Sequence, residues 1–175
     1  MINVEIIINK CKKNLDTYFC NHPFIVWKEE DLQSYFFHLL LEQDQSLYSR
    51  IHREFPVITQ WEPRRWAGML DIAILGIIKD DFNLRNAKID YAIELKFIRD
   101  YRTGKSSSSL QSFKNECIKD RNKLLSNAKN FHDNTKKYFW AFRYIDEPQN
   151  EKAYELMNGI EWDDVIWKYT EFHPI

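Results

Sequence analysis

Met69–Ile78 (MLDIAILGII) and Asp90–Ile98 (DYAIELKFI) are two strongly apolar stretches that decide the fold of this chain. Their density of Ile, Leu and aromatic residues over short runs predicts strands that are buried on both faces. Asp71 interrupts the first stretch. Glu94 and Lys96 interrupt the second, and side-chain alternation points both of them to the same face. An ionised group in such a strand is costly unless it is paired, hydrogen-bonded or bound to a metal. The three charges therefore predict a functional site.

Length and composition favour one ordinary globular domain over residues 1–175. Apolar residues make up 44% of the chain and charged residues 29%, which is a typical balance for a protein with a packed core. The net charge of −1 predicts no broad attraction to polyanions, so any nucleic-acid surface has to be a local patch. With four glycines and no phosphate-binding glycine motif, a loop that cradles a nucleotide is not expected.

The cysteines and the lengths of the apolar runs bear on location. Cys11, Cys20 and Cys117 are odd in number and widely spaced, and they form neither a disulfide framework nor a zinc pattern, which favours a reducing compartment. No apolar run reaches membrane-spanning length, and the first ten residues lack the basic start of a signal peptide. We expect a cytoplasmic protein with no membrane partner.

Apolar periodicity and turn residues predict the order of the other elements. We expect helices at 1–19, 28–45, 110–129 and 151–157, and strands at 50–59, 69–78, 90–98, 137–145 and 165–172, with a polar turn at 61–66. The Ser- and Gly-rich segment 102–109 is expected to be flexible, and one of its serines to cap the helix that follows. This order predicts an α/β fold in which a mixed sheet is covered by helices.

The second predicted helix supplies a fourth charge. Its buried face is marked by Leu32, Tyr35, Phe36, Leu39 and Leu40. Glu29 projects into the middle of that face, Glu30 falls at its edge, and the choice between these two acids stays open. Alternatively, Glu29 only favours the positive end of the helix dipole and bends out to water.

With these charges in place, the chain resembles the PD-(D/E)XK phosphodiesterase superfamily, the restriction-endonuclease-like nucleases. The pattern of that family is an acid on a core helix, an Asp on a core strand and (D/E)-x-K on the next strand, here Glu29, Asp71 and Glu94 with Lys96. Leu70 stands where the Pro of the family name would be, a departure that many members share. The resemblance implies an αβββαβ core over about residues 27–145, with an extra N-terminal helix and C-terminal additions.

The resemblance also implies roles for these residues. Asp71 and Glu94 are the expected direct ligands of Mg²⁺, for which Mn²⁺ substitutes, with the carbonyl of Leu95 as a third ligand. Glu29 is expected to bind through water or to hold a second ion, and Lys96 to orient or deprotonate the attacking water. The chemistry agrees, because Mg²⁺ takes oxygen ligands and activates water for phosphodiester hydrolysis.

Other charged residues are weaker candidates. Nucleic-acid contacts are proposed for Arg64, Arg65, Arg99, Arg102 and Lys105, and the first two serve equally well in a solvated turn. Asp120 is expected at the edge of the apolar stripe of helix 110–129, and Glu54 outward on its strand. The lysines of helix 110–129 are expected on a solvated face; they are Lys114, Lys119, Lys123 and Lys129.

Taken together, these features predict a metal-dependent nuclease that acts on nucleic acid. The preference for DNA over RNA rests on the family resemblance alone. Restriction or anti-phage defence, mobile-element function and repair are compatible roles, for a homodimer or a subunit of a larger complex. The alternatives are a non-catalytic nucleic-acid-binding or assembly module that keeps the fold, and an interaction protein whose buried charges are structural.

Overall fold

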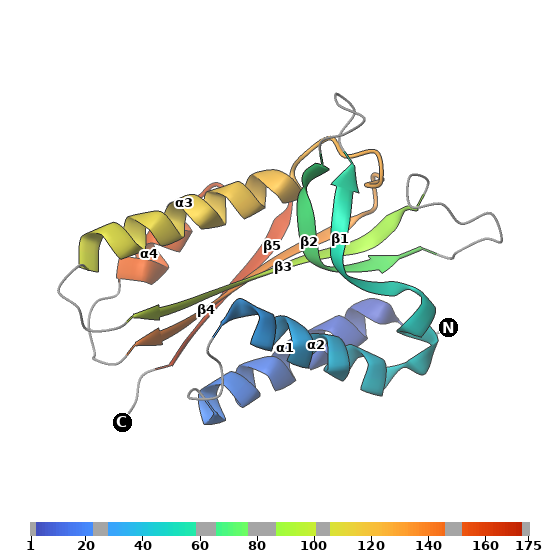
Figure 1. Ribbon diagram of the computed structural model, residues 1–175, viewed down its shortest axis with the longest axis horizontal. Helices are drawn as coiled ribbons and strands as arrows, with labels where there is room; N and C mark the ends of the chain where they lie inside the picture. The colour runs from blue at the N-terminus through green and yellow to red at the C-terminus, as the bar shows by residue number, and fades with distance from the viewer. Residues whose placement is uncertain are drawn as a thin grey trace.

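The computed structural model describes residues 3–22, 28–58, 66–76, 87–100, 106–145 and 152–172 (Figure 1). Within these ranges, the side chains at 58, 66–67, 99–100, 106–110, 145, 152–153 and 156 are not described. The predicted turn at 61–66, apart from Trp66, and the first part of segment 102–109 lie outside the described residues.

One mixed sheet forms the centre of the molecule. Its strands are β1 (Ile51–Ile58), β2 (Trp66–Leu75), β3 (Ile89–Asp100), β4 (Lys136–Ile145) and β5 (Val165–Phe172), and they lie side by side in chain order. Strands β1, β2 and β3 pair antiparallel, whereas β4 and β5 run parallel to β3. The predicted mixed α/β sheet is confirmed.

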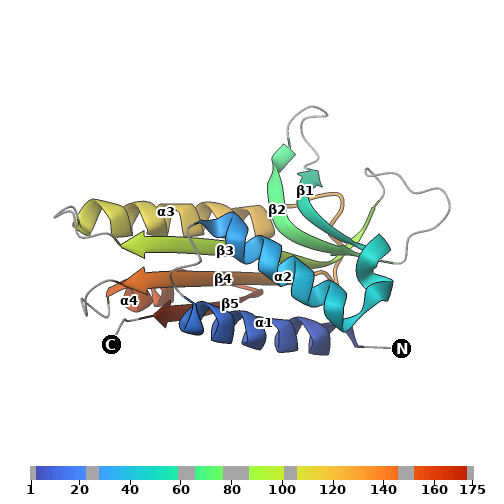
Figure 2. The same ribbon diagram turned by 60° about the horizontal axis from the view of Figure 1, so that its bottom comes forward.

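Helices cover both faces of the sheet (Figures 1 and 2). On one face lie α1 (Val4–Asn21) and α2 (Glu29–Gln43), the latter followed by the 3₁₀ helix η1 (Gln45–Ser49); on the other lie α3 (Ser106–Leu124) and α4 (Lys152–Asn158). The central strands contribute side chains to both layers: Ile72 and Ile93 pack beneath α1 and α2, and Ala73 and Ala92 beneath α3. The prediction of strands buried on both faces is therefore confirmed.

Local side-chain contacts fix where the first two helices begin. The Asn3 side chain accepts a hydrogen bond from the Glu5 backbone N–H at 3.0 Å, which satisfies a free donor of the first turn of α1. At the start of α2, the Lys28 N–H donates to the Asp31 carboxylate at 3.1 Å. This contact sets the rotation of the first turn of α2, which carries Glu29.

The boundaries of α3 differ from the prediction at both ends. The helix begins at Ser106, so Ser106–Ser109 are helical rather than part of a flexible segment. Serine is well tolerated in a first turn, where the backbone N–H groups have no intrahelical partner. The helix ends at Leu124 instead of continuing to residue 129, and just beyond it the Ser126 hydroxyl donates to the Lys123 carbonyl at 2.7 Å. A serine that bonds to backbone in this way competes with helix continuation.

The β1–β2 hairpin changes face halfway along its length. Glu54 has a left-handed φ of 50°, and it interrupts the pairing of β1 with β2. Ile51 packs on the α1–α2 side, whereas Phe55, four residues on, packs on the α3 side, so the normal alternation is broken at Glu54. Glu54 itself is exposed, as expected. The far half of the hairpin thereby turns toward α3 and away from β3 (Figure 2).

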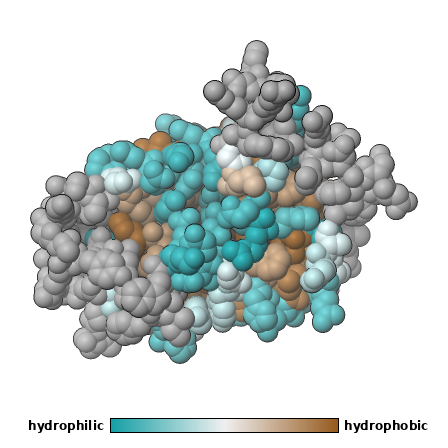
Figure 3. Space-filling view, viewed as in Figure 1, coloured by the Kyte–Doolittle hydropathy of each residue, from teal (hydrophilic) through white to brown (hydrophobic). Residues whose placement is uncertain are grey.

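The β2–β3 ladder ends at the pair Ile72–Ile93, beyond which the two strands separate. In the space-filling view a hydrophilic band crosses the middle of the face between α3 and the start of α2, with more hydrophobic surface on either side (Figure 3). The charged residues predicted from the two apolar stretches lie at this separation of the strands.

The state of the cysteines and the hydropathy of the helices complete the description of the fold. The three cysteines are free thiols, two of them buried. No helix in the described part of the chain has both the length and the hydropathy needed to cross a bilayer.

Candidate active site

Two carboxylates satisfy backbone donors of β3 where β2 leaves it. The Leu95 N–H donates to the Asp71 carboxylate at 2.5 Å, and the Phe97 N–H donates to the Glu29 carboxylate at 3.3 Å. These donors are two residues apart, so both point to the side of β3 from which β2 has departed. Asp71 and Glu29 thus take over hydrogen bonds that a neighbouring strand would make.

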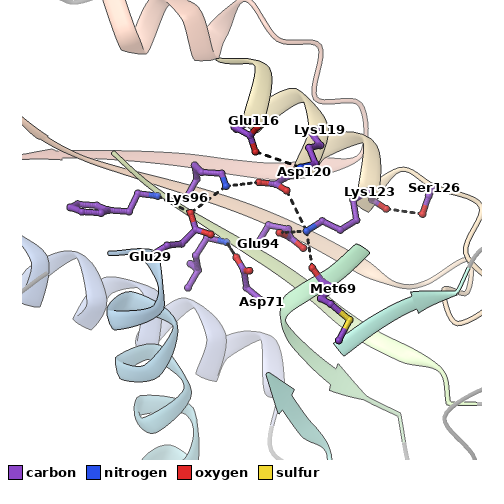
Figure 4. Close-up of polar contacts among 12 residues, drawn as sticks. Glu29, Met69, Asp71, Glu94, Lys96, Glu116, Lys119, Asp120, Lys123 and Ser126 are labelled. Atoms are coloured by element: carbon purple, nitrogen blue, oxygen red, sulfur yellow. Dashed lines mark hydrogen bonds and ion pairs between the residues drawn. The ribbon is translucent and has the colours of Figure 1, made fainter. Parts of the chain in front are cut away.

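Lys96 joins α2 to α3 through this site (Figure 4). Its ammonium lies 3.3 Å from the Glu29 carboxylate and 3.0 Å from the Asp120 carboxylate. Lys96 and Glu94 therefore both face the α3 side of the sheet, while Ile93 and Leu95 pack on the other side, as alternation predicts.

Glu94 is the most deeply buried charge of the site, with 1% of its surface exposed. Its Oε2 atom accepts from the Lys123 ammonium at 2.7 Å, and the same ammonium donates to the Met69 carbonyl at 2.8 Å and lies 3.3 Å from the Asp120 carboxylate (Figure 4). Within the described residues, the other oxygen, Glu94 Oε1, is buried with no hydrogen-bond partner. An unsatisfied buried carboxylate oxygen is unusual and points to a missing ligand.

Burial and mutual repulsion raise the pKa values of the carboxylates. Burial raises the pKa of Asp71 from its ordinary 3.8 to about 7; the Leu95 N–H opposes the shift, and the charges of Glu29 and Asp120 add to it. Burial and then the Asp71 charge raise the pKa of Glu94 well above its usual range. Burial also raises the pKa of Glu29, although Lys96 opposes it. Carboxylates that are held close together at such cost are typical of functional sites.

The two lysines remain positively charged despite their burial. Burial alone lowers the pKa of Lys96, but the charges of Asp120 and Glu29 outweigh that effect, and the net shift is upward. The pKa of Lys123 is likewise raised, because Glu94 and Asp120 outweigh its burial. Among the described side chains of the site, four carboxylates therefore face two ammonium groups, an excess of two negative charges when all are ionised.

The oxygen donors suit a hard divalent cation chemically. The charge of Asp71 raises the pKa of Glu94, so the two carboxylates are close enough to interact. Glu94 Oε1 has no hydrogen bond in the described structure. The N–H and C=O of one strand residue point the same way, so the Leu95 carbonyl faces the Asp71 side together with its N–H. As arranged, however, no group of three or more acidic, His or Cys side chains among the described residues is set to hold a metal ion. Lys123 occupies the contact with Glu94.

The structure brings together the predicted residues Glu29, Asp71, Glu94 and Lys96, and it selects Glu29, because Glu30 is exposed. Glu29 does not bend out to water but contacts β3. Arg99 lies on β3 opposite Tyr144, and its side chain is not described. The remaining basic candidates lie outside the described residues; they are Arg64, Arg65, Arg102 and Lys105.

Two residues of the site, Asp120 and Lys123, come from α3, and the sequence did not predict them as site residues. The prediction that Lys123 lies on a solvated face is wrong, because its side chain is 12% exposed and bridges Glu94 to Asp120. Asp120 is buried, and its carboxylate contacts both Lys96 and Lys123. A sequence signal for Asp120 existed: it lies three residues after Cys117 and four before Leu124, both fully buried.

Replacing Gly68 by alanine will lower the free energy of unfolding by roughly 1–3 kcal/mol, the usual cost of a strained backbone. Gly68 has a φ of 142°, and an added Cβ would lie 3.0 Å from Lys123 Cδ. The control is Gly76→Ala, whose Cβ would lie 3.2 Å from the Asp90 carboxylate, with no strained φ at that glycine. Urea unfolding of both variants measures the difference, and equal losses would show that the conformation of Gly68 carries no special cost.

No protein-family model, curated protein or solved structure matches this chain. The function is therefore inferred from the chemistry and geometry of the site.

Proposed function

We propose that this chain is a magnesium-dependent nuclease that hydrolyses phosphodiester bonds in DNA, built on a restriction-endonuclease-like core. The observation that carries the proposal is the meeting of Asp71, Glu94, Lys96 and Glu29 where β2 separates from β3. The excess of negative charge among the described residues, and a Glu94 oxygen that has no hydrogen-bond partner among them, favour a divalent cation at this place.

The order of elements supports the proposed core. From α2 to β4 the chain forms a helix, three antiparallel strands, a second helix and a strand parallel to β3, an order that agrees with an αβββαβ core. In this arrangement the Asp strand and the Glu-x-Lys strand are neighbours, as the resemblance requires. The α1 helix and the α4–β5 segment are the additions to this core.

Each residue of the site has its own role in the proposed mechanism. Asp71 and Glu94 would hold the metal ion, with the Leu95 carbonyl on the same side. When bound, the ion would supply charge neutralisation at the phosphate and a more acidic water. Lys96, held between Glu29 and Asp120 as an ammonium, would orient the attacking water and offset negative charge in the transition state.

The purified protein is expected to nick plasmid DNA or cut branched DNA in Mg²⁺ or Mn²⁺ and to be inactive in EDTA. Ca²⁺ is expected to support DNA binding without cleavage, because it activates bound water less than Mg²⁺ does. Glu94→Gln protein purified in parallel controls for contaminating nucleases. Intact DNA and RNA substrates across a broad panel with Mn²⁺ would overturn the proposal.

A second candidate is an interaction protein in which the same charges form a structural network. The observation that favours it is that Lys96 and Lys123 already pair with Glu29, Glu94 and Asp120. Such a network predicts that removing one carboxylate destabilises the fold, because a buried cation loses its partner. Asp71 accepts from the Leu95 N–H and, in the described part of the chain, has no ion pair with either lysine, so the two candidates are separated by the response of the protein to Mg²⁺, as argued in the Discussion.

A further inference from the structure

Lys123 makes an unusual set of contacts for a helix-surface lysine. Its ammonium touches the Glu94 carboxylate from β3, the Met69 carbonyl from β2 and the Asp120 carboxylate from α3, at 2.7, 2.8 and 3.3 Å (Figure 4). Two carboxylates and one backbone carbonyl are the type of oxygen ligands that a hard divalent cation takes in proteins. Of these groups, Glu94 is also a ligand of the proposed metal ion, so the ammonium occupies a carboxylate that the ion would need.

The backbone of β2 at Gly68 leaves room for the Lys123 side chain. At Gly68 of β2, a Cβ atom would lie 3.0 Å from Lys123 Cδ and 3.7 Å from its Cε, so the aliphatic stem runs against bare backbone. Lys119, one turn earlier on α3, is 75% exposed and lies 3.8 Å from the exposed Glu116. The contrast shows that the position of Lys123 is specific and not a general property of the lysines of α3.

Charge balance makes Lys123 and a metal ion alternatives at Glu94. This carboxylate is almost wholly buried and needs a cation nearby when it is ionised. A divalent ion at the same carboxylate would repel the ammonium at short range in a medium where such repulsion is strong. Departure of Lys123 would increase the excess negative charge of the cluster from two to three, which favours the metal further.

We propose that Lys123 is an internal stand-in for the metal ion, which neutralises Glu94 in the metal-free protein and must leave before a divalent cation binds. This inference rests on the proposed metal site and adds its regulation: the lysine stabilises the empty site and lowers its metal affinity. Metal binding then moves the Lys123 side chain of α3 away from Glu94.

Direct measurement of Mn²⁺ binding by calorimetry at neutral pH tests the proposal without any assay of activity. The variant is Lys123→Met, which keeps an unbranched stem and removes the charge, and the matched control is Lys119→Met. We expect Lys123→Met to bind Mn²⁺ roughly ten-fold more tightly than the wild type, within the range seen when groups next to a metal site are changed. Lys119→Met should bind as the wild type does. Equal or weaker binding by Lys123→Met would overturn the inference and leave the nuclease proposal standing.

A second measurement uses the unaltered protein and so does not depend on the folding of a variant. Acetylation of lysines, read by mass spectrometry, reports how accessible each amine is. Mn²⁺ should increase the modification of Lys123 several-fold and leave that of Lys119 unchanged. Unchanged Lys123 reactivity under conditions where Mn²⁺ binds would overturn the inference. If neither the wild type nor Lys123→Met binds Mn²⁺, both the inference and the metal-dependent function fail.

Discussion

Replacing Lys96 by alanine will lower the rate of DNA cleavage by roughly 10²-fold or more, while Mn²⁺ binding stays close to that of the wild type. Lys96 contacts Glu29 and Asp120 and belongs to the same face of β3 as Glu94. In the proposed mechanism its ammonium acts on the water and the developing charge rather than as a metal ligand. The loss should appear in kcat with little change in KM, because the interaction is made mainly in the transition state.

The control for this experiment is Lys119→Ala, which removes the same charge from an exposed position of α3. Surface substitutions of this kind change stability by less than about 0.5 kcal/mol, so its cleavage rate should match that of the wild type. Circular dichroism and unfolding curves of Lys96→Ala separate a lost rate from a lost fold. Full activity in folded Lys96→Ala would remove the central residue of the proposed mechanism.

The strands could be predicted because their sequence leaves few alternatives. Met69–Ile78 and Asp90–Ile98 are apolar enough to predict core strands, and Ile72, Ile74, Ile93 and Leu95 within them are fully buried, while the charges within them mark the candidate site. The ends of elements were less predictable, because β2 begins at Trp66 through pairing with Ile58, a tertiary contact. Likewise, the helical state of Ser106–Ser109 depends on the helix that follows, not on serine composition.

The partners of the site residues could be predicted only in part. Glu29 and Lys96 are far apart in the chain, and a helix pattern shows which face is buried but not which strand it meets. Asp120 could have been assigned to the buried stripe from its spacing to Cys117 and Leu124. Lys123 could not, because nothing local separates it from Lys119; only the approach of α3 to Gly68 gives it a buried position.

Replacing Asp71 by asparagine will abolish cleavage and, in EDTA, will stabilise the protein at neutral and higher pH. The folded-state pKa of Asp71 is raised by burial from 3.8 to about 7, so the unfolded chain loses this proton first as the pH rises. The wild type therefore loses stability between about pH 4 and pH 7, at about 1.4 kcal/mol per unit, and the penalty is constant above that window. Below about pH 4 both states are protonated and the penalty is absent. Asparagine can still accept the Leu95 N–H and carries no such penalty.

The measurement is urea unfolding in EDTA at a series of pH values, with the wild type subtracted from the variant at each pH. Subtraction cancels other titrating groups, such as His52, whose pKa burial lowers. The increase in the free energy of unfolding caused by Asp71→Asn should be near zero at about pH 4 and reach on the order of 2–4 kcal/mol above pH 7. The control is Asp90→Asn, since Asp90 lies 3.0 Å from Arg50 in a partly exposed ion pair. Asp90→Asn should lower the free energy of unfolding by up to about 1 kcal/mol and leave the cleavage activity unchanged.

The response to Mg²⁺ decides between the two candidate functions. In a structural network Lys96 and Lys123 already balance Glu29, Glu94 and Asp120, so Mg²⁺ would leave the stability of both the wild type and Asp71→Asn unchanged. In a metal site the carboxylates stay close together and buried although this lowers the free energy of unfolding of the metal-free protein. Binding of the ion restores that free energy. Mg²⁺ should then raise the unfolding midpoint of the wild type and leave that of Asp71→Asn unchanged, because only the wild type keeps the ligand. A wild type that Mg²⁺ stabilises, beside an inactive Asp71→Asn protein that does not respond to Mg²⁺, is thus the result that a structural network does not produce.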